Sequence, residues 1–93
     1  LASTTSWNSS TNTCAVGNDL SANNSTGFSA LPGGLRLYSD GSFYFLGYLG
    51  YWWSSSEYVG STAWYRLLGY HNATVYRNND YKSYGFSVRC LRD

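Results

Sequence analysis

The chain has 93 residues and a net charge of +1, with 19% aromatic but only 12% charged residues. This length suits one small domain, so we expect residues 1–93 to form a single domain. The six basic residues stand singly along the chain, so we expect no nucleic-acid partner. No apolar run approaches the roughly 18 residues of a membrane-spanning helix, so we expect no membrane span in this segment.

Residues 1–30 are rich in Ser, Thr, Asn and Gly and show no sustained helical or strand period, which predicts loops. Isolated apolar side chains are expected to anchor these loops to a core: Trp7, Val16, Leu20 and Phe28. The sequence PGG at 32–34 then predicts a sharp turn.

A strand pattern begins after this turn. Six segments are predicted as strands: 35–38, 43–48, 50–58, 63–70, 73–77 and 82–92. Asp40-Gly41 between the first two is a hairpin signal, and the sequence NND at 78–80 is predicted to be a turn, because Asn and Asp tolerate left-handed geometry. Together the segments predict a mainly β protein with long loops and an antiparallel sheet. We see no convincing amphipathic helix.

Two of these segments alternate clearly, and their side chains can be assigned to faces. In 63–70 one face is predicted to carry Trp64, Arg66, Leu68 and Tyr70, and the other Tyr65 and Leu67. In 82–92 one face is predicted to carry Phe86, Val88 and Cys90, and the other Ser87, Arg89 and Leu91.

The many large side chains allow two interpretations. Rings bury much area per residue, so six residues are expected to fill the core: Phe43, Phe45, Trp52, Trp64, Phe86 and Val88. The stretch from 58 to 81 instead mixes Tyr with Asn, Ser and Arg, and this chemistry is typical of binding surfaces. Its candidate ligand-binding residues are Tyr58, Tyr65, Tyr70, His71, Asn72, Tyr76, Arg77, Asn78, Asn79 and Tyr81.

Catalytic and metal-binding patterns are weak. His71 is the only histidine and is expected in a turn, and the carboxylates are scattered, so we expect no enzyme. Glu57 is more easily explained as a loop-fixing carboxylate than as a catalytic one. No cofactor is expected, although Asn78, Asn79 and Asp80 could supply oxygen ligands to a calcium ion. A disulfide between Cys14 and Cys90 would close a long loop and could add about 4 kcal/mol to stability.

At GFSALPGG, YWWSSSE, AWYRLL and KSYGFSVRCLRD the chain resembles the Fibrobacter succinogenes major paralogous domain. This family is abundant in secreted and surface lipoproteins of Bacteroidetes and Fibrobacteres. The resemblance covers nearly the whole chain and implies a C-type-lectin-like fold of the α+β class. It corresponds to the C-terminal half of that domain, so the chain is expected to lack the family's N-terminal helical half.

The resemblance also bears on partners. In similar folds a cysteine of the missing half pairs with one on the last strand, so Cys90 could be free, paired with Cys14, or bonded to another chain. The uncovered core implies a missing N-terminal segment or a homo-oligomer as partner. Calcium-dependent C-type lectins use Glu-Pro-Asn or Gln-Pro-Asp with Trp-Asn-Asp, and none of these strings occurs here.

We therefore expect an exported or cell-surface binding module, non-catalytic, that recognises a glycan or a protein through its Tyr-, Asn- and Ser-rich face. Its location would be secreted or on a bacterial cell surface, as the resemblance implies. The alternative is a structural or assembly module of a fimbria-like or cell-envelope protein, in which the rings pack against another subunit.

Overall fold

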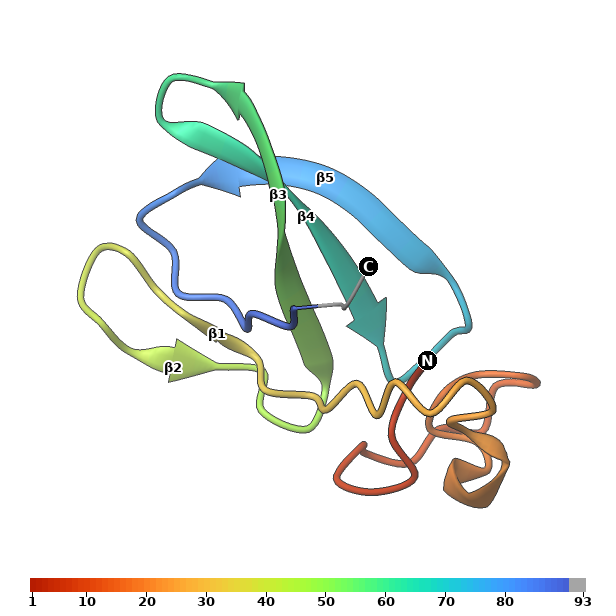
Figure 1. The fold of residues 1–93 in the computed structure, drawn as a ribbon. Helices are drawn as coiled ribbons and strands as arrows, with labels where there is room; N and C mark the ends of the chain where they lie inside the picture. Colours follow the sequence, from red (N-terminus) through yellow and green to blue (C-terminus); the bar gives the residue numbers. More distant parts are fainter. Residues whose placement is uncertain (91–93) are drawn as a thin grey trace.

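The computed structural model describes residues 1–90. In this part of the chain the fold is mainly β with antiparallel sheets, as predicted (Figure 1). The described residues contain no α-helix and one short 3-10 turn. The elements are η1 (Leu20–Ala22), β1 (Leu35–Arg36), β2 (Phe43–Tyr44), β3 (Leu49–Val59), β4 (Thr62–Gly69) and β5 (Val75–Tyr81). Within residues 1–90 there is no helix with the length and hydropathy of a membrane span.

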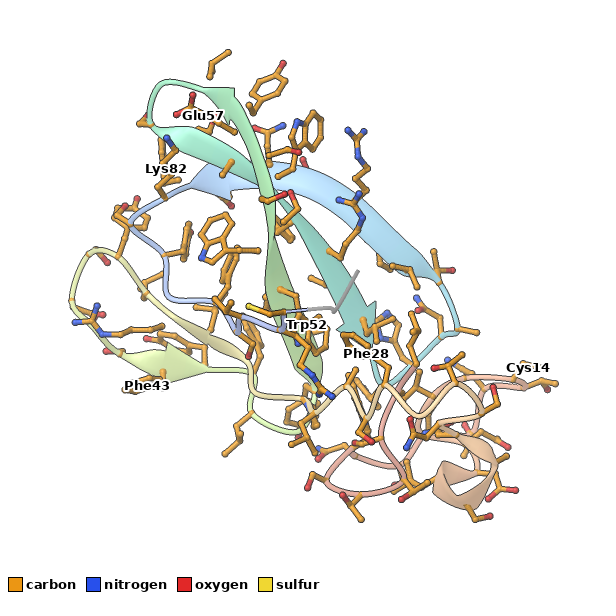
Figure 2. All side chains as sticks on the ribbon, in the orientation of Figure 1. Cys14, Phe28, Phe43, Trp52, Glu57 and Lys82 are labelled. Atoms are coloured by element: carbon orange, nitrogen blue, oxygen red, sulfur yellow. The ribbon has the colours of Figure 1, made fainter. Side chains whose placement is uncertain are left out.

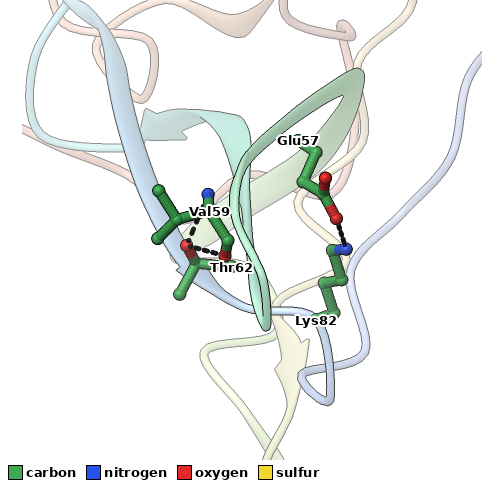
Figure 3. A network of polar contacts seen from close by, with 4 residues as sticks. All are labelled: Glu57, Val59, Thr62 and Lys82. Atoms are coloured by element: carbon green, nitrogen blue, oxygen red, sulfur yellow. Dashed lines mark hydrogen bonds and ion pairs between the residues drawn. The ribbon is translucent and has the colours of Figure 1, made fainter.

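Strands β3, β4 and β5 form an antiparallel three-stranded sheet with β4 in the centre. The β3–β4 hairpin turns through Gly60 and Ser61, and Gly60 has a φ of 40°, a region that glycine enters without steric cost. At the base of this turn the Thr62 hydroxyl accepts from the Val59 N–H at 3.3 Å and donates to the Val59 carbonyl at 3.0 Å (Figure 3). These bonds fix the register at the end of the hairpin.

The three serines of YWWSSSE form an irregular stretch in β3. Trp53 pairs with Tyr65 and Glu57 with Ala63, so three residues on β3 lie opposite one residue on β4. Extra residues of this kind bend a strand and increase its twist. Beyond the bend, Glu57 makes an ion pair with Lys82, which links β3 to the residue that follows β5 (Figure 3). Both side chains are exposed, so the pair adds at most about 1 kcal/mol.

The predicted turn at 78–80 is wrong, because these residues belong to β5. Asn78, Asn79 and Asp80 pair in register with Tyr65, Trp64 and Ala63 of β4. A continuous ladder of hydrogen bonds to a central strand outweighs the local turn preference of Asn and Asp. The chain turns at Tyr70 and His71, as predicted for His71. Strand β5 begins at Val75, so the prediction of a strand at residues 73 and 74 is wrong.

The predicted strand at 82–92 is wrong over residues 82–90, and residues 91 and 92 lie outside the described part. This segment runs between the β1–β2 hairpin and β3 (Figure 1). Gly85 exchanges two backbone hydrogen bonds with Arg36 of β1, while Ser87 donates to Tyr51 and accepts from Trp53 of β3. Because the segment bonds to the hairpin at one residue and to β3 at another, neither side forms a continuous ladder.

The predicted hairpin is confirmed as β1 and β2, which are shorter than expected, with Leu35 opposite Tyr44 and Arg36 opposite Phe43. The N-terminal loops pack against the end of β4 and the turn after it (Figure 1). Trp7 is 4% exposed and its indole N–H donates to the Ala30 carbonyl at 3.1 Å. Irregular backbone is tolerated there because its polar groups find partners, such as Gly17 N–H on the Tyr70 carbonyl at 2.8 Å.

Two clusters of apolar side chains lie on the two faces of the sheet. The inner cluster has Leu35, Tyr51 and Tyr65 at its centre, with Leu37, Leu49, Trp53, Leu67, Tyr84 and Phe86 around it. The N-terminal cluster joins Leu68 of β4 to Ala2, Trp7, Val16 and Ala30, with Leu20, Phe28, Trp52 and Tyr70 packed against it. The alternation predicted for 63–70 is therefore confirmed. We call the face of Tyr65 and Leu67 the inner face and that of Trp64, Arg66 and Leu68 the outer face.

Several residues predicted for the core are exposed. The exposed fractions are 77% for Phe43, 47% for Phe45 and 70% for Val88, so these predictions are wrong. No described element covers the hairpin on that side, and the molecule measures only 17 Å in its thinnest direction. Phe86 packs in the inner cluster as predicted, and Trp52 and Trp64 are partly buried. Cys14 and Cys90 are both free and exposed, so they form no disulfide with each other here.

Candidate binding surface

The outer face carries a row of three long side chains across the sheet. Trp52 of β3 lies opposite Arg66 of β4, and Arg66 lies opposite Arg77 of β5. In the next row, Trp64 of β4 lies opposite Asn79 of β5. Directly opposite residues in antiparallel strands project from the same face. The register of the sheet therefore places two arginines, two tryptophans and an asparagine side by side.

At the exposed end of this face, Trp64 contacts two other side chains, Tyr58 and Arg77. The ring of Tyr58 meets it edge-on, with centroids 4.9 Å apart and planes at 81°. The guanidinium of Arg77 lies 3.8 Å from the Trp64 ring centroid, a cation–π contact worth about 0.5–1 kcal/mol at an exposed site. Tyr58 keeps half of its surface exposed. The contacts with the Trp64 ring thus hold the Arg77 and Tyr58 side chains in place while leaving them accessible.

Arg66 and Arg77 are like charges in direct cross-strand opposition, an arrangement that destabilises a sheet. Arg66 donates to the Tyr65 carbonyl at 3.3 Å, and in residues 1–90 the only ion pair is that of Glu57 with Lys82. Neither arginine is therefore neutralised by a carboxylate of the described chain. The outer face carries uncompensated positive charge.

A largely apolar groove of about 320 Å³ opens next to this row. Its lining includes Trp52 and Phe28, which Figure 2 shows near each other, together with Leu68, Arg66 and Arg89. The guanidinium of Arg89 lies 4.9 Å from the centroid of the Phe28 ring. Arg66 thus borders both the groove and the Arg77–Trp64 contact. We define the outer surface as Tyr58, Trp64, Arg66, Arg77 and Asn79.

The ten candidate residues from the sequence do not form one surface. Three of them, Tyr58, Arg77 and Asn79, lie on the outer surface. Tyr65 does not, because it is only 9% exposed and sits in the inner cluster. Asn78 lies opposite Tyr65 on the inner side.

The other candidates lie at the two ends of the sheet. At the β4–β5 turn the Asn72 amide donates to the Tyr76 hydroxyl at 2.8 Å, and His71 is exposed beside it. Tyr70 packs edge-on against Tyr48, with centroids 5.3 Å apart. At the opposite end Tyr81 meets the Tyr38 ring at 5.6 Å. Backbone twist and the turn therefore separate residues that are neighbours in sequence.

Sequence reasoning missed Arg66 and Arg89, and it assigned Trp52 and Trp64 to the core alone. A signal for Arg66 was present, since it stands between Trp64 and Leu68 on one predicted face. A charged residue in such a half-buried alternation has to be exposed or paired. Arg77 was among the candidates, but its position opposite Arg66 could not be found, because it depends on the register of β5.

The geometry bears on two other kinds of site, a calcium site at residues 78–80 and a catalytic site formed by Glu57 and His71. Because 78–80 is a strand, its side chains alternate between the faces, so oxygens of Asn78, Asn79 and Asp80 do not converge on one calcium ion. Residues 1–90 contain no group of three His, Cys, Asp or Glu side chains that could hold a metal ion. Glu57 lies opposite Ala63 near the start of β4, whereas His71 follows the end of β4. The two side chains therefore do not converge in one catalytic site.

The sequence of nearly the whole chain matches one known family. The chain matches the Fibrobacter succinogenes major domain over residues 3–92, and it belongs to this family. The resemblance seen in GFSALPGG, YWWSSSE and the related motifs is thereby confirmed. The comparisons with curated proteins and with solved structures gave no significant match.

Proposed function

We propose that the chain is a non-catalytic binding module that recognises a glycan or a protein through its outer surface. The observation that supports this most is the unneutralised pair Arg66–Arg77 beside exposed aromatic rings. Aromatic rings offer flat apolar area for a sugar face or a side chain, and Arg and Asn offer hydrogen bonds to hydroxyl and carboxylate groups. A ligand that brings negative charge would relieve the repulsion between the two arginines.

Family membership supports three finer proposals about the same chain. We propose that its fold is C-type-lectin-like, that it works as an exported protein, and that it resides on a bacterial cell surface or in the medium. An experimental structure together with fractionation of the source cells would test them. A fold without the C-type-lectin-like strand arrangement, or a cytosolic location, would contradict them.

The binding proposal is tested with a glycan array that holds acidic and neutral glycans, and with pull-downs from host and bacterial extracts. Each is done with and without calcium. We expect acidic ligands to be retained, and the double variant Arg66→Gln/Arg77→Gln to lose them. Arg36→Gln is the matched control, because it removes the same kind of charge from the hairpin. The proposal would be refuted if the folded wild-type chain bound no glycan and no protein in any of these conditions.

A second function, as an assembly module, is favoured by a separate observation. The β1–β2 hairpin and the loop after it expose Phe43 and Leu46 at 77% each, and Val88 is 70% exposed. Exposed apolar side chains of this kind are covered in subunit interfaces. Native mass spectrometry decides between the two functions. A stable monomer supports the binding module, whereas an obligate multimer that protects Phe43 and Leu46 supports assembly.

A further inference from the structure

A second cavity, of about 390 Å³, lies on the inner face of the sheet between the β1–β2 hairpin and strands β3 to β5. We call it the aromatic cavity. Residues of its wall include Tyr44, Tyr51, Tyr65, Tyr84, Phe86 and Asp80. Five segments of the chain contribute to it: the hairpin, strands β3 and β4, the inner side of β5 and the C-terminal segment. It is separate from the outer surface, which lies across the sheet.

The rings of the aromatic cavity are arranged around Phe86. Tyr51 stacks on Phe86 at 4.8 Å and 20° between planes, and Tyr84 does so at 5.6 Å and 23°. Tyr65 meets Phe86 edge-on at 5.0 Å. Because Tyr51 and Tyr65 are each only 9% exposed, their rings are held firmly by the inner cluster. The wall thus contains two firmly held rings beside Phe86.

Oxygen atoms also reach into the aromatic cavity. Among the described residues the hydroxyls of Tyr51, Tyr65 and Tyr84 make no side-chain hydrogen bond, yet no buried polar side-chain atom is left without a partner. These three hydroxyls therefore contact solvent, and they are free to accept hydrogen bonds from a ligand.

Of the residues 1–90 that line this cavity, Asp80 is the one that is charged. Within residues 1–90 its carboxylate has no cationic partner, and nearby Lys82 is already paired with Glu57. Burial, the neighbouring phenols of Tyr65 and Tyr84, and the Asp80 carboxylate raise the pKa of Tyr51 to about 12. Burial and then the Asp80 carboxylate likewise raise the pKa of Tyr65 and of Tyr84. The negative field of Asp80 thus reaches three phenols of the wall.

We propose that the aromatic cavity binds an organic cation with N–H donors, and that the guanidinium group of an arginine side chain is its best match. Ring faces attract a cation held over them, and a guanidinium can stack flat on them. The same group can donate two parallel hydrogen bonds to Asp80 and further ones to the phenol oxygens. A quaternary ammonium has no donors, so it would leave these oxygens unused.

The test is an NMR titration of the full chain with N-acetyl-arginine amide. Its matched probe is N-acetyl-citrulline amide, which has nearly the same shape but no charge. We expect saturable shifts of the Tyr51, Tyr84 and Phe86 ring signals with the arginine probe and none with the citrulline probe. Asp80→Asn should weaken binding about tenfold or more, because a charged hydrogen-bond acceptor is lost. Asp40→Asn, which removes the same charge from the hairpin turn, should bind as wild type does.

Three outcomes would overturn the proposal: no saturable shift with the folded wild-type chain, equal binding of the citrulline probe, or full binding by folded Asp80→Asn. The comparison of the two probes uses the wild-type chain, so it decides even where Asp80→Asn fails to fold. The variant Arg66→Gln/Arg77→Gln should keep its full response to the arginine probe. The proposal for the outer surface and the proposal for the aromatic cavity can therefore be refuted independently of each other.

Discussion

Arg66 and Arg77 face each other across β4 and β5 on the outer face of the sheet, and neither forms an ion pair with a carboxylate of residues 1–90. Arg77 rests on the ring of Trp64, whereas Arg66 makes one hydrogen bond to the neighbouring Tyr65 carbonyl. A sheet optimised for stability alone would place opposite charges at these positions. The unneutralised pair therefore supports the proposed binding role of the outer surface.

The first prediction concerns the loss of folding stability that the Arg66–Arg77 pair causes. Arg66→Gln should raise the free energy of unfolding by about 0.2–1 kcal/mol, because it removes a like-charge contact and keeps most of the side-chain stem. Chemical denaturation at low salt measures this change, and added salt should shrink it. Arg36→Gln on the hairpin should show no such gain. A less stable Arg66→Gln protein at low salt would contradict the explanation.

The second prediction concerns the backbone at the start of β1. Gly34 and Gly27 have φ values of 65° and 76°, so an alanine at either is strained by about 1–2 kcal/mol. A Cβ at Gly34 would in addition overlap the Tyr44 carbonyl, whereas a Cβ at Gly27 meets nothing within 4 Å. We expect Gly34→Ala to cost about 1–3 kcal/mol more than Gly27→Ala in thermal unfolding. Equal losses would show that β2 does not pack over Gly34.

The third prediction concerns alkaline pH. The pKa of Tyr51 is about 12 in the folded chain, against an ordinary value of 10.0 that the unfolded chain should show. A raised pKa favours the neutral phenol in the folded state, so its stabilising contribution is complete below pH 10 and is lost as the pH rises from about 10 to 12. Since one pKa unit corresponds to about 1.4 kcal/mol, this group accounts for a loss of no more than about 3 kcal/mol.

Tyr51→Phe provides the control for this titration. It keeps the ring in the inner cluster but removes the ionising group, so its stability should fall less between about pH 10 and 12. Denaturation at several alkaline pH values measures the difference between the two proteins. Identical pH profiles would mean that the pKa of the Tyr51 phenol is not raised in the folded chain.

Local sequence patterns predicted those features that depend on neighbouring residues. Alternation in 63–70 assigned Tyr65 and Leu68 to opposite faces because successive side chains of a strand point to opposite sides. Asp40-Gly41 located the hairpin because its turn chemistry is local; the Ser42 N–H donates to the Asp40 carboxylate at 2.9 Å. These features depend on residues within one strand or one turn, so they can be predicted from the local sequence.

Features that depend on distant segments could not be predicted. The pairing of Arg66 with Arg77 follows from the register of β5, which also converts 78–80 from a turn into a strand. Phe43 looks like a core residue by composition, but nothing in residues 1–90 covers it. The aromatic cavity likewise escaped prediction, because Asp80 meets Tyr84 and Phe86 only after the C-terminal segment has passed between β1 and β3.

The central claim is that the sheet sorts its aromatic side chains into an inner cluster and an accessible outer surface. Hydroxyl-radical footprinting with mass spectrometry tests this on the wild-type chain. Tyr58, which is 50% exposed, should be oxidised readily, whereas Tyr51 and Tyr65, each 9% exposed, should be protected until the chain unfolds. If Tyr65 were oxidised in the folded chain as fast as Tyr58, the assignment of the two faces would be contradicted.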